Sequence, residues 1–345
     1  MSDFAERLIR WHKQHGRHDL PWQNTRDPYR VWLSEIMLQQ TQVAAAIPYY
    51  TRFLERFPAL VDLAAAPVAE VMSLWSGLGY YARARNLHAC AQAVMRDHGG
   101  AFPQRPEQLA ALPGIGRSTA NSIATFCFGA RAPILDGNVK RVFCRAFGIE
   151  GFPGSSAVEK RLWTLATELM PAKHGDIYNQ AQMDLGATLC TRGKPRCGDC
   201  PLHDICVAHA TGRQGELPQP KPRRTIPERA ATLLVLRDAT GRVLLEQRPP
   251  AGIWGGMQSL PELPAERTAA EFITNGLGLR LIAVSPAPTF VHVFSHFRLL
   301  ITPLVCSVET GNSAKESRHQ WLAPAAVSGA ALPASIRKIL DTLLH

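Results

Sequence analysis

The sequence predicts a mainly α-helical region, then a linker, then a smaller α+β domain. Apolar residues recur at helical spacing from residue 4 to about residue 210, interrupted by short turns rich in proline and glycine. Residues 211–229 hold four prolines and an excess of basic side chains, which is typical of an extended linker. Beyond it, two apolar runs flank the turn sequence DATG at residues 238–241, the pattern of a β-hairpin.

Composition and charge narrow the class of protein. A chain of 345 residues, 46% hydrophobic and 19% charged, is long enough for two or three domains, each with its own core. The sequence holds no run of about 18 uncharged apolar residues and no secretory signal pattern at its N-terminus, so we expect a cytoplasmic, nucleoid-associated protein with no membrane span. The net charge of +10 favours a polyanionic partner, although charge alone is weak support.

Four of the eight cysteines fall within seventeen residues, at Cys190, Cys197, Cys200 and Cys206. Two disulfides would need an oxidising compartment, for which the sequence gives no sign. Zinc ribbons usually carry two C-x-x-C pairs across a longer gap, whereas here one such pair lies between two single cysteines. This spacing favours a 4Fe–4S cluster over zinc. The remaining cysteines, in apolar helical contexts, are interpreted as buried small hydrophobes: Cys90, Cys127, Cys144 and Cys306.

A first candidate carboxylate, Glu35, lies two turns inside a helix that Asp27 and Pro28 are expected to start. Its neighbours at spacings of three and four are mostly apolar: Val31, Trp32, Leu38 and Gln39. Desolvation there would raise the pKa of Glu35 and keep it protonated near neutral pH, as a general acid requires. The alternative is an exposed, ion-paired glutamate at the edge of the apolar stripe.

A second candidate carboxylate, Asp136, ends an apolar run and precedes a helical face, so we expect it to cap that helix. The simpler interpretation is a cap alone, which stabilises by about 1 kcal/mol. A carboxylate at a helix N-terminus is also expected to have a lowered pKa and to stay ionised, able to face a developing cation. Two carboxyls with pKa values moved apart are typical of glycosidic bond cleavage.

The glycine pair Gly114 and Gly116, in LPGIG, raises the question of a phosphate site. A dinucleotide fingerprint is excluded because no strand precedes the pair and no third glycine follows. Both flanking segments, RPEQLAAL and RSTANSIATFCFG, have helical patterns, which predicts a helix–hairpin–helix. The amides at the start of the second helix would then form a phosphate site that reads no sequence.

Several long motifs carry a family resemblance: WLSEIMLQQTQV, GLGYYARARNLH, LPGIGRSTA, PILDGNVKR, NQAQMDLGATLC and the cysteine loop. They resemble the endonuclease III superfamily of base-excision glycosylases and, within it, the MutY family of adenine DNA glycosylases, over nearly the whole chain. The implied organisation is an iron–sulfur helical domain at 1–25 and 130–212, and a six-helix domain with the helix–hairpin–helix at 26–129. A linker at 213–228 and a Nudix-like domain at 229–345 complete it.

The resemblance implies roles for individual residues. Glu35 matches the general acid that protonates N7 of the extruded adenine, and Asp136 the carboxylate that stabilises or captures the deoxyribosyl oxocarbenium ion. Asn138 stands where the family orients that carboxylate. Ser118 replaces the lysine with which strand-cutting relatives form a Schiff base, which implies a monofunctional glycosylase. Lys140 could trap an aldehyde by chance, but a DNA-contacting helix lysine is the simpler interpretation.

The resemblance also implies DNA contacts. Gln40, Thr41 and Tyr80 match residues that wedge into the base stack, although alone they would pass for ordinary helix and turn surface. In HVFSHF, Ser295 between Phe294 and His296 matches the serine that recognises 8-oxoguanine opposite the adenine; by itself this stretch would be a strand end. The segment RPPAGIWGGMQSLPELP resembles the start of the Nudix-like domain, but AERTAAEFITNGLGL lacks a glutamate-rich metal helix, so diphosphate hydrolysis is rejected.

The sequence thus predicts a DNA-repair hydrolase that excises adenine paired with 8-oxoguanine, and more weakly adenine paired with G, from double-stranded DNA. The base must be flipped out, because its glycosidic bond is inaccessible inside a duplex. We expect a monomer. One alternative is a bifunctional glycosylase and lyase for oxidised pyrimidines, which Ser118 and the Nudix-like domain oppose. Another is an iron–sulfur DNA sensor without catalysis, which the presence of both Glu35 and Asp136 opposes.

Overall fold

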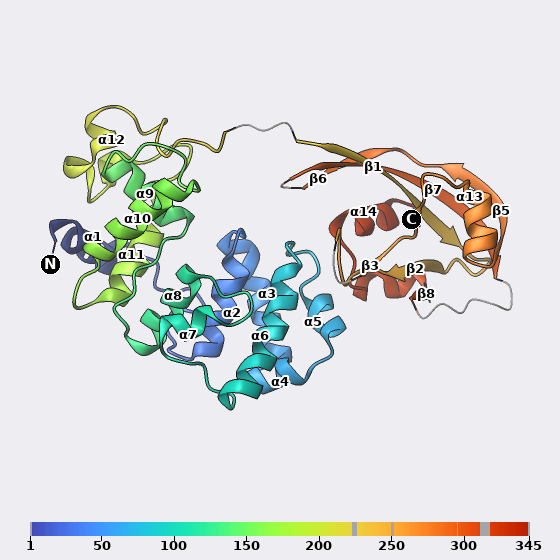
Figure 1. Ribbon diagram of the computed structural model, residues 1–345, viewed down its shortest axis with the longest axis horizontal. Coiled ribbons are helices and arrows are strands. Elements are labelled where there is room, and N and C mark those ends of the chain that lie inside the picture. Colours follow the sequence, from blue (N-terminus) through green and yellow to red (C-terminus); the bar gives the residue numbers. More distant parts are fainter. Residues whose placement is uncertain (1, 223–225, 250–251, 295, 311–317, 344–345) are drawn as a thin grey trace. The chain divides into compact units, whose positions relative to one another are not determined.

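The computed structural model describes residues 2–222, 226–249, 252–294, 296–310 and 318–343. The chain divides into two compact units, one of residues 1–65 with 89–223 and one of residues 66–88 with 224–345. In the described part of the chain, the helices as far as α12 (Val207–Ala210) precede the strands, which begin with β1 (Glu228–Arg237) (Figure 1). The predicted fold class, a helical region followed by an α+β domain, is confirmed.

The helical region is built from short to medium helices joined by tight turns. They are α1 (Asp3–His15), α2 (Pro28–Leu38), α3 (Val43–Arg56), α4 (Leu60–Ala65), α5 (Val68–Leu74), α6 (Ala82–His98), α7 (Pro106–Ala110), α8 (Arg117–Phe128), α9 (Gly137–Ala146), α10 (Ser156–Leu169), α11 (Gly175–Thr188) and α12 (Val207–Ala210). Two expected caps are confirmed. Asp27 accepts a hydrogen bond from the Tyr29 amide at the start of α2, and Asp136 accepts one from the Val139 amide at the start of α9.

One core of the first unit joins the beginning of the chain to its middle. Helix α1 packs against α9 and α11 through side chains that are distant in sequence. The ring of Phe4 lies 5.9 Å from that of Phe143 and 5.2 Å from that of Phe147. Because α9 starts at the Asp136 cap, this core holds the carboxylate in place.

The predicted helix–hairpin–helix is present as α7 and α8. The hairpin between them turns at Gly114, whose φ of 75° suits glycine, and the Ile115 amide donates to the Leu112 carbonyl over 3.2 Å. Gly116 caps α8 without a side-chain hydrogen bond. Both glycines are exposed, and the first amides of a helix have no partner within the helix itself.

The second unit contains a mixed sheet. Its strands in the described part of the chain are β1 (Glu228–Arg237), β2 (Val243–Gln247), β3 (Gln258–Ser259), β4 (Glu262–Leu263), β5 (Leu279–Pro286), β6 (Phe290–Val293), β7 (Arg298–Thr310) and β8 (His319–Leu322). The main order is β3-β2-β1-β7-β5, with β1 parallel to β7. The expected hairpin at residues 238–241 joins β1 to β2, and a second hairpin joins β6 to β7.

The helical elements of this sheet domain are short. Helix α13 (Ala269–Glu271) is followed by a π-helical turn at Phe272–Gly276, and α14 (Ala334–Leu343) lies near the end of the chain. Among the described residues, no helix combines the length and apolarity needed to cross a bilayer.

The predicted linker begins as ordered structure. Leu217 is 1% exposed, and its carbonyl accepts a 2.8 Å hydrogen bond from Nε of Arg145. The Gly151 amide donates to the side chain of Gln219 over 3.0 Å. Residues as far as 219 therefore pack on the helical unit. The domain limits predicted from the sequence remain predictions.

Candidate active site

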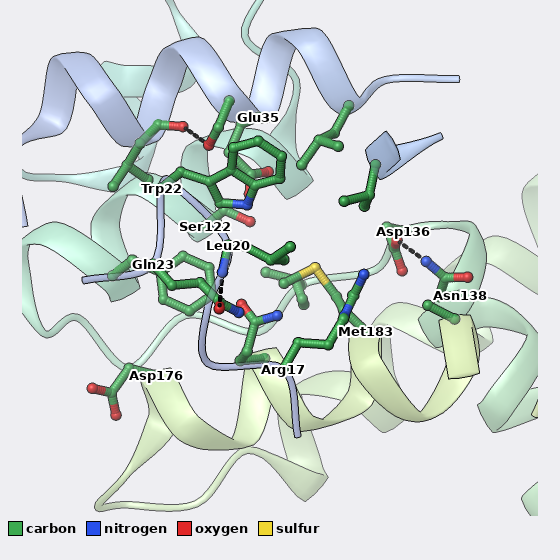
Figure 2. A pocket seen from close by; sticks show the side chains of 18 of the residues that line it. Arg17, Leu20, Trp22, Gln23, Glu35, Ser122, Asp136, Asn138, Asp176 and Met183 are labelled. Carbon is green, nitrogen blue, oxygen red and sulfur yellow. Dashed lines mark hydrogen bonds between the residues drawn. The ribbon is translucent and has the colours of Figure 1, made fainter. Parts of the chain in front are cut away.

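A cavity of about 650 Å³ lies within the helical unit, a size typical of small-molecule sites. Its wall comes from the segment before α2, from α2 itself, from the start of α8, from the loop before α9 and from α11. Glu35, Asp136 and Asn138 line this cavity (Figure 2). Ser118 also lines it. The four residues predicted for catalysis are therefore brought together from three separate stretches of the chain.

Glu35 projects from α2 and makes a side-chain hydrogen bond with Ser122. Burial raises the pKa of Glu35 to about 7, and the charge of Asp136 adds to the rise while the Ser122 hydrogen bond opposes it. The direction agrees with the one expected from the apolar neighbours of Glu35. A carboxyl with this pKa holds a proton in about half of the molecules at neutral pH, so it can act as an acid.

Asp136 is the cap of α9, and both of its oxygens are occupied. Oδ1 accepts the Val139 amide over 2.8 Å, and Oδ2 accepts the side-chain amide of Asn138 over 3.1 Å. Burial nevertheless raises the pKa of Asp136, outweighing these hydrogen bonds and the nearby charge of Arg141, which lower it. The expectation of a lowered pKa is therefore wrong. The sequence showed the helix cap, but not the desolvation that opposes it.

Asn138 is held in turn by Arg141. The Asn138 side-chain oxygen accepts Nη2 of Arg141 over 2.8 Å, and the same nitrogen donates to the Gly186 carbonyl over 2.7 Å. Nε of Arg141 donates to the Cys190 carbonyl over 2.7 Å. A Cβ on Gly186 would lie 2.5 Å from Cβ of Asn138, so glycine permits this close approach of α9 and α11. Sequence reasoning had assigned no role to Arg141 or Gly186.

Ser118 and Lys140 differ in their relation to the cavity. The Ser118 hydroxyl accepts a 3.0 Å hydrogen bond from the Leu135 amide, next to Asp136, and so fixes the approach to the cap. Lys140 is not among the residues that line the cavity. Its ammonium lies 2.6 Å from a carboxylate oxygen of Glu159.

The sequence analysis did not predict one wall of the cavity. This wall comes from residues 17–26, an irregular segment without helical or strand periodicity. Trp22 and Gln23 line the cavity from this segment, and Gln180 and Met183 line it from α11. The Trp22 ring packs edge-on against Tyr50 at 5.3 Å. An aromatic face with nearby amides suits a flat heterocyclic ligand.

A buried aspartate anchors that segment to α11. Asp184 is fully buried and accepts hydrogen bonds from the amide, Nε and Nη2 of Arg17 at 2.8, 2.8 and 2.6 Å. Nε2 of His12 lies 3.2 Å from Oδ2 of Asp184, the oxygen that also accepts the Arg17 amide. Burial acts to raise the pKa of Asp184, but the hydrogen bonds from His12 and Arg17 outweigh it, so the pKa is lowered.

The four clustered cysteines, Cys190, Cys197, Cys200 and Cys206, are half-buried in the loops that follow α11. Arg145, 3% exposed, points Nη1 at the sulfur of Cys190 over 3.4 Å. Its other guanidinium hydrogen bonds go to the carbonyls of Leu217, Thr191 and Arg192. A buried cation beside thiols suits thiolates that carry negative charge, as an iron–sulfur cluster requires. Among the described residues, no three His, Cys, Asp or Glu side chains are grouped around a single-ion metal site.

The other cysteines fit their expected role. Cys90, Cys144 and Cys306 are buried, and Cys127 is half-buried.

Three stretches of the chain match models of known protein families. Residues 33–168 match the HhH-GPD superfamily of base excision DNA repair proteins, and residues 190–206 match the iron–sulfur binding domain of endonuclease III. Residues 232–342 match the NUDIX domain. An adenine DNA glycosylase of Buchnera aphidicola is 33% identical over 340 residues, covering 98% of this chain and 97% of the relative. The chain belongs to the adenine DNA glycosylase family.

The human adenine DNA glycosylase is 34% identical and covers 98% of this chain, which spans 73% of the human protein. Among solved structures, a thermostable thymine-DNA glycosylase has a TM-score of 0.56 at 29% identity, covering 60% of this chain and 95% of that protein. Endonuclease III bound to DNA has a TM-score of 0.53 at 22% identity and shares the fold. The family match establishes a DNA-binding N-glycosylase with a 4Fe–4S cluster as its cofactor.

Two residues with predicted DNA contacts in this member of the adenine DNA glycosylase family have unusual backbones. Gln40 and Tyr80 have φ angles of 57° and 51°, in the left-handed region that non-glycine residues seldom adopt. Both side chains are exposed. Such strain concentrates at functional loops. Thr41 is half-buried and lines the cavity.

Two further predicted contacts of this family member, Phe294 and His296, lie between β6 and β7. Ser295 lies outside the described residues. Phe294 is half-buried and His296 exposed. The Phe294 amide donates to the Phe297 carbonyl over 2.9 Å, and the two rings stack at 4.4 Å. This hydrogen bond and the stacked rings join the residue after β6 to the residue before β7.

Proposed function

We propose that the protein is a monofunctional adenine DNA glycosylase, acting on adenine paired with 8-oxoguanine and less rapidly on adenine paired with G. One observation carries the proposal. Glu35, with a pKa of about 7, and Asp136, whose oxygens accept the Val139 amide and the Asn138 side-chain amide, line the same cavity. An acid and a carboxylate on one cavity are the groups that N-glycosyl cleavage needs.

In this mechanism the extruded adenine enters the cavity beside Trp22, and Glu35 transfers its proton to N7. The bond between C1′ and N9 then breaks, and both electrons stay with the base, which leaves as neutral adenine. The cation at C1′ faces the ionised form of Asp136, toward which Val139 and Asn138 direct their N–H groups. Water adds to C1′ and gives its proton to Glu35, which leaves an abasic site.

The absence of strand cutting follows from the side chains beside Asp136. Serine at position 118 has no amine for a Schiff base, and its hydroxyl is engaged by the Leu135 amide. Lys140 is paired with Glu159 and does not line the cavity. The abasic product should therefore keep its backbone until alkali is added.

DNA contacts complete the proposal. The backbone amides at the exposed Gly114 and Gly116 would bind a phosphate. Gln40, Thr41 and Tyr80 would wedge into the base stack beside the flipped base and the opposing guanine. Phe294, Ser295 and His296 would contact the opposing 8-oxoguanine. When bound by Cys190, Cys197, Cys200 and Cys206, the cluster supplies iron–thiolate bonds that close the loop after α11. The protein would act as a monomer on nucleoid DNA.

The test uses 5′-labelled duplexes that contain A·8-oxoguanine, A·G or A·T, incubated with the purified holoenzyme and divided into samples with and without hot alkali. The proposal predicts a break at the adenine of the first duplex, a slower break in the second and none in the third. Each break should need alkali. Breaks of equal yield without alkali would contradict the monofunctional assignment, and intact A·8-oxoguanine DNA would contradict the activity itself.

A further inference from the structure

The loop between β2 and β3 carries a tryptophan in a strained conformation. Trp254 is 7% exposed and has a φ of 54°, in the left-handed region. Its ring centroid lies 6.2 Å from that of Phe294 and 6.5 Å from that of His292. His292 in turn packs edge-on against Phe294 at 4.5 Å. A buried aromatic ring on this loop therefore supports the tip of the β6–β7 hairpin.

The conformation of Trp254 is fixed by its surroundings. Its carbonyl accepts the Met257 amide over 3.0 Å, and the Gly256 amide donates to the Pro249 carbonyl over 2.9 Å. Arg248 lies 5.9 Å from the centre of the indole ring and is itself held by Glu246 at 2.9 Å and by Glu262 at 2.8 Å. Strain maintained by so many contacts is typical of functional sites.

A side chain from the same compact unit holds this loop from outside the sheet. Arg85 in α6 donates a hydrogen bond from Nη1 to the carbonyl of Gly255, next to Trp254, although 170 residues separate the two. Two more hydrogen bonds tie residues 66–88 to the end of the chain. Ser73 donates to the Gly329 carbonyl and Ser76 to the Leu332 carbonyl, both over 2.9 Å.

We propose that Trp254 and Arg85 are positioning residues for the recognition of 8-oxoguanine. Arg85 holds the loop through the Gly255 carbonyl, and Trp254 packs against Phe294. Together they would keep Phe294 in a fixed position relative to the segment that carries Tyr80. This inference rests on the proposed function, in which the hairpin contacts the opposing base. Neither residue lines the cavity that holds Glu35 and Asp136. Substituting either residue should therefore change the preference for 8-oxoguanine over G opposite the adenine, rather than the cleavage of the glycosidic bond.

The expected effect is a loss of selectivity. A displaced hairpin would lose contacts that 8-oxoguanine makes and guanine does not, so excision opposite 8-oxoguanine should slow while excision opposite G stays within about twofold. Small displacements of a positioning group can cost up to about a hundredfold in rate. For Trp254→Ala we therefore expect the ratio of the excision rate opposite 8-oxoguanine to that opposite G to fall by about tenfold. Arg85→Ala should lower the ratio in the same direction.

The experiment measures single-turnover excision rates of the holoenzyme on A·8-oxoguanine and A·G duplexes. The variants are Trp254→Ala, Trp254→Phe and Arg85→Ala, and Trp254→Phe should restore most of the ratio because it keeps a ring against Phe294. Matched controls are Trp321→Ala, another tryptophan of the sheet domain, packed beside Arg242, and Arg96→Ala, an exposed arginine of α6 bound to Asp97. Both controls should keep the wild-type ratio. Thermal unfolding of each protein reports whether it is folded.

The outcomes separate the inference from the function on which it rests. Equal wild-type rates on the two duplexes would contradict the proposed preference and this inference together. A wild-type preference that Arg85→Ala and Trp254→Ala both keep would overturn the inference alone. A ratio that falls equally in Trp321→Ala would also overturn it, because general destabilisation of the sheet domain would then explain the loss. If Trp254→Ala fails to fold, Arg85→Ala decides.

Discussion

The side-chain amide of Asn138 donates to Oδ2 of Asp136 over 3.1 Å while its oxygen accepts Arg141 over 2.8 Å. The amide thus has one orientation, and Asp136 is held by a chain of contacts that ends at the Gly186 and Cys190 carbonyls. A carboxylate fixed in this way needs little reorganisation when a cation forms beside it.

Asn138→Ala should slow adenine excision. It removes a hydrogen bond to a charged group, which contributes about 1.5–3 kcal/mol, or roughly tenfold to a hundredfold in rate. Single-turnover rates would measure this, with duplex affinity and unfolding temperature as controls. Arg141→Lys should cause a smaller fall in the excision rate. Lysine keeps the positive charge but lacks the planar guanidinium that donates to Asn138, Gly186 and Cys190 at once. An Asn138→Ala rate equal to that of the wild type would show that Asp136 needs no such support.

The excision rate should depend on pH on both sides of an optimum. Glu35 acts in its protonated form with a pKa of about 7, so the rate should fall as pH rises through that value. Asp136 acts in its ionised form and has a raised pKa. As pH is lowered, the rate should therefore begin to fall at a pH higher than about 4, the usual pKa of an aspartate. Rates measured across about pH 4–9 would test both limbs. A rate that stays constant up to the alkaline end would remove Glu35 from the role of acid.

Asp184→Asn should destabilise the helical unit. Breaking a buried ion pair from one side costs about 3–5 kcal/mol. Because the folded-state pKa of Asp184 is lowered, its contribution is present above the unfolded-state pKa and is lost as pH falls through the folded value. Urea unfolding at pH 7 and at a pH well below the ordinary aspartate pKa of about 3.9 should therefore show a smaller difference from wild type at the lower pH. Asp97→Asn, an exposed control paired with Arg96, should show no measurable change.

Ser118→Lys should introduce strand cleavage. The new amine would lie at the cavity wall beside the segment that leads to Asp136, where it could attack C1′. Borohydride trapping and gels run without alkali would detect the Schiff base and the break. Ser118→Ala serves as the matched control, since it loses the Leu135 hydrogen bond and gains no amine. A folded lysine variant that excises adenine without any trapped adduct would contradict the predicted geometry.

Local signals in the sequence were sufficient for much of this site. The caps at Asp27 and Asp136, the hairpin at Gly114 and the four clustered cysteines depend on neighbours within a few residues, and each forms as predicted or is matched by the family model. The pKa direction of Glu35 followed from its own helix face.

Features that depend on distant segments could not be read in the same way. Asp136 has a raised pKa because the folded chain buries it, and a cap motif contains no measure of that burial. The contact between Gly186 and Asn138 joins two helices whose crossing the sequence does not specify. Arg17 and Asp184 stand 167 residues apart, and the irregular segment between α1 and α2 offers no periodicity that would place Trp22 at the cavity.

The central claim is that Glu35 supplies the proton that releases adenine. The most direct test is the single-turnover rate of adenine release from an A·8-oxoguanine duplex by Glu35→Gln, beside Glu55→Gln, an exposed control on α3. The account predicts a fall of about 10²–10⁴-fold or more for Glu35→Gln with duplex affinity retained, and no change for Glu55→Gln. Release by Glu35→Gln at the wild-type rate would contradict it.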